Sequence, residues 1–205
     1  MAKRFSAWLR RASTGWVALS ALLIFLLFSA LVLPQQAAKS EEETGSSESP
    51  DTSFLYSPGD LYRLAGSYGQ QGRQAYVRAR FTFDLVWPLV YTLFLVTAIS
   101  WVFGKACAPS SRWQRANLVP LLGALFDCLE NLSTSLVMLR YPEQMAVVAA
   151  LAPLFTALKW TLLSASFVLL LGGIAVGAWR WAVPRLQGSL LGPGEGPQRE
   201  HHDHE

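Results

Sequence analysis

The chain has 205 residues, of which 52% are hydrophobic and only 15% are charged, and its formal net charge is +3. Soluble domains carry about 25% charged residues, so this composition argues against a soluble enzyme and indicates an integral membrane protein. The charge is too small to indicate a nucleic-acid-binding surface, and we expect the partner of the chain to be a lipid bilayer and not a nucleic acid.

The chain begins with a basic segment, residues 1–15, whose cations are Lys3, Arg4, Arg10 and Arg11. Residues 16–34 follow as an apolar run of about 18 residues, near the minimum for a membrane span and long for the core of a signal peptide. Cleavage after this run is disfavoured, because Gln36 stands where a small residue is required. We therefore predict an uncleaved first transmembrane helix.

Residues 35–57 are rich in serine and glutamate and cannot bury enough apolar surface to fold, so they are predicted to be a disordered polar linker. A helix start follows, with Ser57 as the N-cap, Pro58 at the first helical position and Asp60 completing a capping box. Apolar residues then recur with helical spacing, which predicts an extracytoplasmic amphipathic helix over residues 58–83.

Gly66, Gly69 and Gly72 favour a break, so this segment is predicted to form one helix or two, lying on the membrane surface or over the end of the bundle. Its polar face includes Arg73, Arg78 and Arg80. A solvated face is the simpler interpretation, and an arginine-lined site for lipid phosphate is the alternative.

Three further spans are predicted, at residues 84–104, 117–139 and 143–182. The second span carries Trp87 and Tyr91 near its start, where an aromatic belt would lie. A basic loop, residues 105–116, joins it to the third span. The fourth span is too long for a bilayer core of about 30 Å, so part of it must tilt, project or bend, and we expect a kink near Pro153.

Residues 183–205 are rich in proline and glycine and are predicted to be a disordered cytoplasmic tail. The tail ends in a histidine-rich stretch that lacks the spacing of a zinc site, so we expect no metal and no cofactor. Cys107 and Cys128 fall in different environments, so no disulfide is expected, and Cys128 is expected to be buried. Gly173 and Gly177 form a GxxxG pattern, a weak indication of close helix contact or dimerisation.

The third span contains polar groups where hydrocarbon is expected. Asp127, Glu130, Asn131 and Thr134 share one helix face, because residues three and four apart are neighbours. An ionised carboxylate at mid-bilayer costs roughly 2.5 to 3.5 kcal/mol, so this face is predicted to point at other helices. Asp84 in the second span and Lys159 in the fourth are expected to converge on it, and Lys159 would keep one carboxylate charged.

The distribution of cations predicts the topology. With four spans, ten Lys and Arg residues lie on the side of both termini and six lie on the other side. The excess belongs in the cytoplasm, so we predict a multi-pass plasma-membrane protein with both termini cytoplasmic.

Three functions remain open. The first is a structural or interaction component, in which the polar residues bond across helices at about 0.6 kcal/mol each. The second is a small carrier for protons or cations, which with four spans would act as a homo-oligomer or with another membrane protein. The third is a membrane enzyme that uses Asp127 or Glu130 as a general acid or base on a lipid-soluble substrate, although no nucleophile motif or phosphate loop accompanies them.

The chain also resembles a known group of proteins in residues 56–182. The run from Tyr68 to Tyr76, followed by Asp84, by Asp127 with Glu130 and Asn131, and by Lys159 with Trp160, looks like that of small four-span prokaryotic membrane proteins with no assigned function. The resemblance implies a fold and a location and no activity. The residues that it singles out are Gly72, Arg73, Tyr76, Asp84, Asp127, Glu130 and Asn131.

Overall fold

The computed structural model describes residues 1–50 and 55–190, and every regular element within them is helical. Four helical stretches are long and apolar enough to cross a membrane, which confirms the all-α class and the number of candidate spans. These stretches are Gly15–Thr44, Gly69–Ala106, Arg112–Arg140 and Ala146–Val183.

The N-terminal part forms two helical stretches separated by a short turn. α1 (Ala2–Ala12) comes first, and α2 (Gly15–Leu27) begins the first apolar stretch. A five-residue π-helical turn, Phe28–Val32, then leads into α3 (Leu33–Thr44). A π-helical turn inserts an extra residue into the helical repeat, so the side chains of α3 are rotated about the helix axis relative to those of α2.

The prediction of a disordered linker from residue 35 is wrong for its first ten residues. α3 continues to Thr44 and ends at Gly45, which has the left-handed φ of 69° that glycine adopts without strain. The sequence of α3 is mostly glutamine, alanine, serine and glutamate, and Lys39 and Glu43 form an exposed pair one turn apart. Good helix formers and a preceding helix therefore outweigh the polarity of the segment.

Residues 58–83 form two helices, α4 (Pro58–Ser67) and α5 (Gly69–Arg80), which separate at Gly69 with a φ of 63°. The predicted capping box is confirmed, because the Ser57 hydroxyl accepts a bond from the Asp60 amide and the Asp60 carboxylate accepts one from the Ser57 amide (2.9 Å). The backbone hydrogen bond from Ser57 is the main reason why the pKa of Asp60 lies below its usual value.

The remaining chain forms the longest helices. α6 (Phe83–Ala106) is followed by a short 3-10 helix, Arg112–Leu118, then by α7 (Val119–Arg140) and α8 (Ala146–Leu190). α8 is one helix through Pro153, and it continues past the predicted start of the disordered tail at residue 183. The terminal histidine-rich stretch lies outside the described residues.

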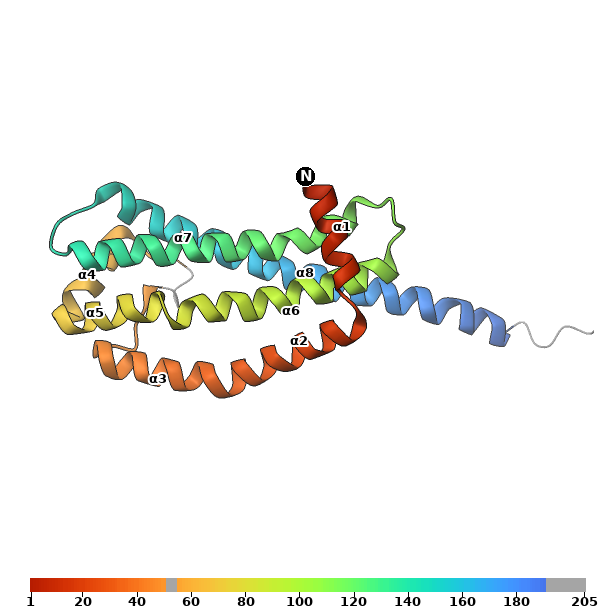
Figure 1. Ribbon diagram of the computed structural model, residues 1–205, viewed down its shortest axis with the longest axis horizontal. Helices are drawn as coiled ribbons and strands as arrows, with labels where there is room; N and C mark the ends of the chain where they lie inside the picture. Colours follow the sequence, from red (N-terminus) through yellow and green to blue (C-terminus); the bar gives the residue numbers. More distant parts are fainter. Residues whose placement is uncertain (51–54, 191–205) are drawn as a thin grey trace, which may run out of the picture.

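The long helices run side by side, and the short ones lie at the two ends (Figure 1). α8 packs along α7 and α6, while α2 packs mainly on α6. At one end, called the α5 end below, α4 and α5 cover α7 and α8; at the other, called the α1 end, α1 lies across the bundle. α8 extends beyond the α1 end (Figure 1).

Two separate apolar cores hold these parts together. One lies along α6 and α8 and includes Leu95, Ile99 and Leu170. The other lies at the α5 end, where Leu61 and Tyr76 from α4 and α5 pack against α7 and α8. The outward faces of α2 and α8 are apolar and exposed, as expected for surfaces that meet lipid.

A polar network attaches α1 to the bundle. The hydroxyl of Ser6, which is fully buried, lies 2.8 Å from Asn117 Oδ1 and accepts a bond from Arg10 (2.9 Å). The Asn117 amide donates in turn to the Ser100 hydroxyl on α6 (2.9 Å). The N-terminal segment is therefore a docked helix and not only a basic tail.

The GxxxG pattern is used within the chain. A Cβ on Gly173 would lie 2.6 Å from the Phe103 ring and 2.9 Å from Val102, so the absence of a side chain allows α8 to approach α6. A Cβ on Gly177 would lie 3.9 Å from Ala106, also on α6. The pattern therefore carries no argument for a dimer.

This close approach predicts a position-specific effect of alanine. Gly173→Ala should lower the free energy of unfolding by about 1 to 3 kcal/mol, because overpacking outweighs the gain in helix propensity. Gly172→Ala is the matched control, because a Cβ there meets nothing within 4 Å, and it should leave stability unchanged or slightly raised. Thermal unfolding in detergent compares the two, and equal effects would contradict the packing.

Candidate functional site

The polar face of α7 points into the bundle. Asp127, Glu130, Asn131 and Thr134 are all less than a tenth exposed, and Lys159 on α8 is equally buried. The Lys159 ammonium lies 2.5 Å from a Glu130 oxygen and 3.6 Å from an Asp127 oxygen. We call Asp127, Glu130 and Lys159 the buried ionic cluster.

Helix packing explains how Lys159 reaches both carboxylates. Asp127 and Glu130 are three residues apart and so lie on one face of α7. One turn earlier, Gly123 has no side chain, and a Cβ there would lie 3.7 Å from Leu162 on α8. The two helices therefore come close beside the cluster, which places the lysine within reach.

Tyr91 completes the cluster from α6. Its hydroxyl donates a hydrogen bond to the second Asp127 oxygen (2.9 Å), and its ring is almost fully buried. The predicted place of Tyr91 in an aromatic belt is therefore wrong, because this residue points to the protein interior. Trp87, one turn earlier, stacks on Phe25 of α2 and on Phe28 of the π-helical turn, with ring centroids 5.6 Å apart in each case.

Asp84 is not part of the buried ionic cluster. Its carboxylate pairs with Arg80 at 2.7 Å, and the Arg80 side chain is only 7% exposed. The Arg80 guanidinium also lies over the Tyr76 ring, 4.3 Å from the centroid, and donates to the Ser49 hydroxyl (3.2 Å). This second ion pair joins α5 to the start of α6.

Asn131 and Thr134 play lesser parts. The Asn131 amide donates to the Asp84 carbonyl at 3.5 Å, which is a long bond. The Thr134 hydroxyl donates to the Glu130 carbonyl one turn back (3.0 Å), so its hydrogen bond is made within α7. Both residues lie on the predicted inward face, but neither contacts Lys159 through an ion pair or a hydrogen bond described here.

The three arginines of the proposed phosphate site do not converge. Arg73 donates to the Ala65 carbonyl (2.9 Å) and lies over the Tyr141 ring, so it joins α5 to α4 and to the turn after α7. Arg78 is exposed, and Arg80 is bound to Asp84. The alternative of a lipid-phosphate site at these residues finds no support in their arrangement.

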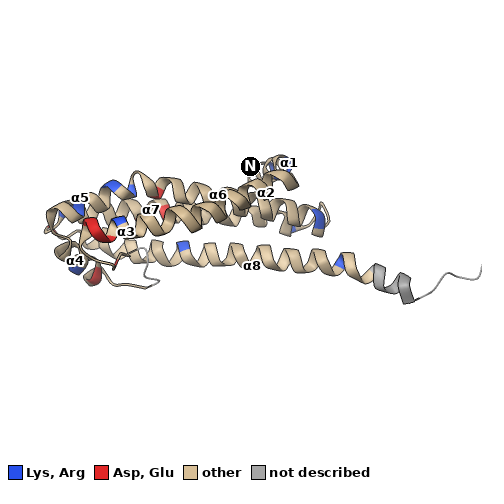
Figure 2. Cartoon of the chain, turned by 90° about the horizontal axis from the view of Figure 1, so that it is seen from below, with Lys and Arg blue, Asp and Glu red and all other residues tan. Residues whose placement is uncertain are grey.

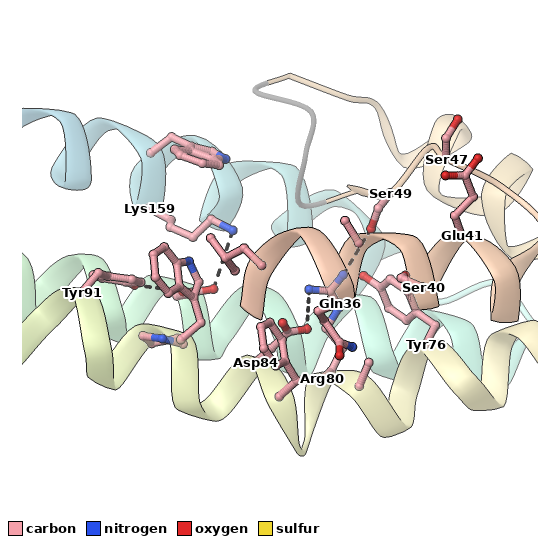
Figure 3. Close-up of a pocket in the computed structure, with 18 of the residues that line it drawn as sticks. Gln36, Ser40, Glu41, Ser47, Ser49, Tyr76, Arg80, Asp84, Tyr91 and Lys159 are labelled. Atoms are coloured by element: carbon pink, nitrogen blue, oxygen red, sulfur yellow. Dashed lines mark hydrogen bonds and ion pairs between the residues drawn. The ribbon is translucent and has the colours of Figure 1, made fainter. Parts of the chain in front are cut away.

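A cavity of about 490 Å³ connects the two ion pairs. Figure 3 shows Lys159 and Tyr91 at one end of it and Arg80 with Asp84 toward the other. α3 forms one wall through residues at helical spacing, among them Gln36 and Ser40. The aromatic residues of the lining are Tyr76, Phe83, Trp87, Tyr91 and Trp160.

Sequence reasoning missed most of this cavity. The polar run after Pro34 was expected to be disordered, so α3 could not be assigned as a wall. Trp87 and Tyr91 are one turn apart, which indicates a shared face, but the pattern does not say whether that face meets lipid or protein.

The cysteines have no part in the site. Both Cys107 and Cys128 are free, as expected, but Cys128 lies on the exposed side of α7 and not in the interior. Within residues 1–50 and 55–190 no group of three or more His, Cys, Asp or Glu side chains is placed to hold a metal ion.

The cluster predicts a large effect of removing its cation. Lys159→Met leaves two buried carboxylates without their counter-ion, and stability should fall by about 3 to 5 kcal/mol. Adding Glu130→Gln should restore much of it, because one charge and its repulsion disappear. Arg140→Met is the control: it breaks the exposed pair with Glu143 and should cost less than about 1 kcal/mol. If thermal unfolding showed the same loss of stability for Lys159→Met and for Arg140→Met, the result would contradict a buried ion pair at Lys159.

Comparisons with protein-family models, with curated proteins and with solved structures give no match for this chain. The resemblance to four-span prokaryotic proteins therefore finds no support in these comparisons.

Proposed function

We propose that this is a plasma-membrane protein that binds a small apolar organic cation in the cavity, with binding linked to protonation of the buried ionic cluster. A carrier that exchanges such a cation for a proton is the transport activity that follows from this chemistry. The proposal rests chiefly on one observation, the excess of carboxylates over cations around a cavity that five aromatic residues also line.

The charges favour a positive ligand. Glu41, Asp84 and Asp127 line the cavity together with only two cations, Arg80 and Lys159. Glu130 adds a further carboxylate behind Lys159. Two carboxylates that share one ammonium carry a net negative charge unless one of them holds a proton. Either a proton or a bound ligand cation can neutralise this charge, so the two compete for the site.

The aromatic part of the wall favours a ligand that carries apolar groups. Aromatic rings attract cations placed over their faces, and the described structure already uses this contact for Arg80 over Tyr76 and for Lys159 beside Trp160. A volume of about 490 Å³ is within the range of small-molecule sites. A permanent cation that carries aromatic or alkyl groups matches both the charge and the lining.

The topology in this proposal follows the distribution of cations. The α1 end holds Lys3, Arg4 and Arg11, together with the basic loop before α7, so it is placed in the cytoplasm with both termini. α4, α5 and the α5 end of the cavity then lie outside. Lipid covers the exposed apolar faces of α2 and α8, and a second copy or another membrane protein is the alternative for these faces.

Cysteine labelling tests this topology. In a variant whose two native cysteines are changed to serine, Ser47→Cys lies at the α5 end and Ser110→Cys in the loop at the α1 end, and both positions are exposed. An impermeant maleimide should label only Ser47→Cys in intact cells and both variants after lysis. Labelling of Ser110→Cys alone in intact cells would reverse the orientation.

Binding can be tested with two probes of the same shape and opposite charge. Tetraphenylphosphonium should quench the fluorescence of Trp87 and Trp160 in the purified protein, and tetraphenylborate should quench it much less. Because protons compete with the cation, phosphonium affinity should fall as the pH falls. Asp127→Asn should weaken binding and flatten this pH dependence, whereas Glu42→Gln, an exposed carboxylate outside the cavity lining, should change neither.

A structural role is the second candidate, and the short contact between Lys159 and Glu130 favours it. In that case the cluster only fastens α7 to α8. Asp127→Asn would then shift stability by no more than about 1 kcal/mol, because Glu130 still pairs with Lys159. Equal quenching by both probes, unchanged in Asp127→Asn, would exclude the binding proposal and leave this one.

A further inference from the structure

We propose that the α1 end carries a binding site for the phosphate of an anionic phospholipid, built between α1, the end of α6 and the 3-10 helix. This site is separate from the cavity at the buried ionic cluster, and it does not depend on the proposed function. Its ligand is a membrane lipid that stays bound beside the chain.

The site is a surface cavity of about 310 Å³. Arg10 from α1 and Lys105 from the last turn of α6 both line it, together with Ser13, Trp101 and Gln114. Within the described residues, α1 reaches this position because Ser6 is buried against Asn117 and the Gln114 carbonyl accepts a bond from Arg10 (3.1 Å). The fold thus brings two cations from distant parts of the sequence to one cavity.

Among residues 1–50 and 55–190, which the structure describes, no carboxylate forms an ion pair with Arg10 or Lys105. The sequence contains no Asp or Glu in residues 1–40, 85–126 or 144–190, which supply the α1 end. In Figure 2 the acidic residues of the described chain lie toward the α5 end and in the middle of α7, while Lys and Arg also mark the α1 end. Arg10 bonds only neutral oxygens among the contacts described here, and the Lys105 ammonium lies 5.5 Å from the centroid of the Trp101 ring.

The position of the cavity favours a lipid over a soluble anion. Exposed tryptophans surround the α1 end, as they do where a protein crosses the membrane interface: Trp8, Trp16, Trp101 and Trp113. Phe5 and Trp8 stack on one exposed face of α1 (6.1 Å), and Lys3, Arg4 and Arg11 are also exposed on this helix. Such a helix lies in the interface with its apolar face toward the acyl chains.

A phosphate at this cavity would therefore meet two cations while its acyl chains follow apolar protein surface. α2 starts next to Trp101, where a Cβ on Gly15 would lie 3.0 Å from the indole nitrogen, and exposed apolar residues such as Val17 and Leu19 continue along it. Basic pockets between membrane helices bind anionic headgroups in this way.

Native mass spectrometry of the full chain tests the site. Micelles doped with equal amounts of phosphatidylglycerol and phosphatidylcholine should leave one phosphatidylglycerol bound in preference. Lys105→Gln should reduce this retention about fivefold, the effect of one interfacial cation, and Lys105→Arg should keep it. Arg112→Gln is the matched control, because Arg112 is an exposed cation at the same end that does not line the cavity.

A steric variant tests the cavity without removing charge. Gly104 lines the cavity, and a Cβ there meets nothing within 4 Å, so Gly104→Leu should fill space and displace the lipid while both cations remain. Thermal unfolding checks that each variant is folded, and Lys105, being exposed, should not be needed for folding. Calorimetry with inorganic phosphate alone should show no binding.

Three outcomes would overturn the proposal. Equal retention of the two lipids would exclude a headgroup site. Equal losses in Lys105→Gln and Arg112→Gln would mean that net charge at this end, and not the cavity, attracts lipid. Binding of inorganic phosphate that depends on Lys105 but no retention of phosphatidylglycerol would assign the cavity to a free anion.

Discussion

The structure depends on one buried ammonium group that two carboxylates share. Lys159 lies between Glu130 and Asp127, and all three side chains are removed from water. Buried charges are costly unless they are paired, so this contact fixes the rotation of α7 relative to α8 and requires that the two helices stay close. The two helices come close at Gly123, and Tyr91 extends the contact to α6 through its hydrogen bond to Asp127.

The cavity follows from this arrangement. The cluster occupies one end, and beside it the Trp87 ring, which also contacts Tyr91, stacks on Phe25 and so joins α6 to α2. The π-helical turn at Phe28–Val32 lies before α3, which supplies a polar wall. π-helical turns are frequently found at functional sites, and here one separates the part of the helix that packs on aromatic rings from the part that faces the cavity.

The two ends of the bundle differ in chemistry. The α5 end has its own apolar core and balances its charges in pairs, as Arg80 does with Asp84 and Arg63 does with Glu48. In the part of the chain that the structure describes, the α1 end has cations without carboxylates and a series of exposed tryptophans. A membrane matches the chemistry of the α1 end, because anionic phospholipid headgroups provide negative charge for its cations and the interface accommodates its indole rings.

The sequence by itself determined the helical class, the four apolar stretches, the capping box at Ser57 and the inward direction of Asp127 and Glu130. These depend on local periodicity and on the cost of placing polar groups in hydrocarbon. Both are properties of a single helix and do not require knowledge of its neighbours. The tertiary structure decided the partners: Lys159 contacts Glu130 and Asp127, Asp84 pairs with Arg80, and Tyr91 points inward. Partner choice depends on the relative height and rotation of helices, which contacts between distant residues set, as at Gly123 and Gly173 where α8 comes close to its neighbours.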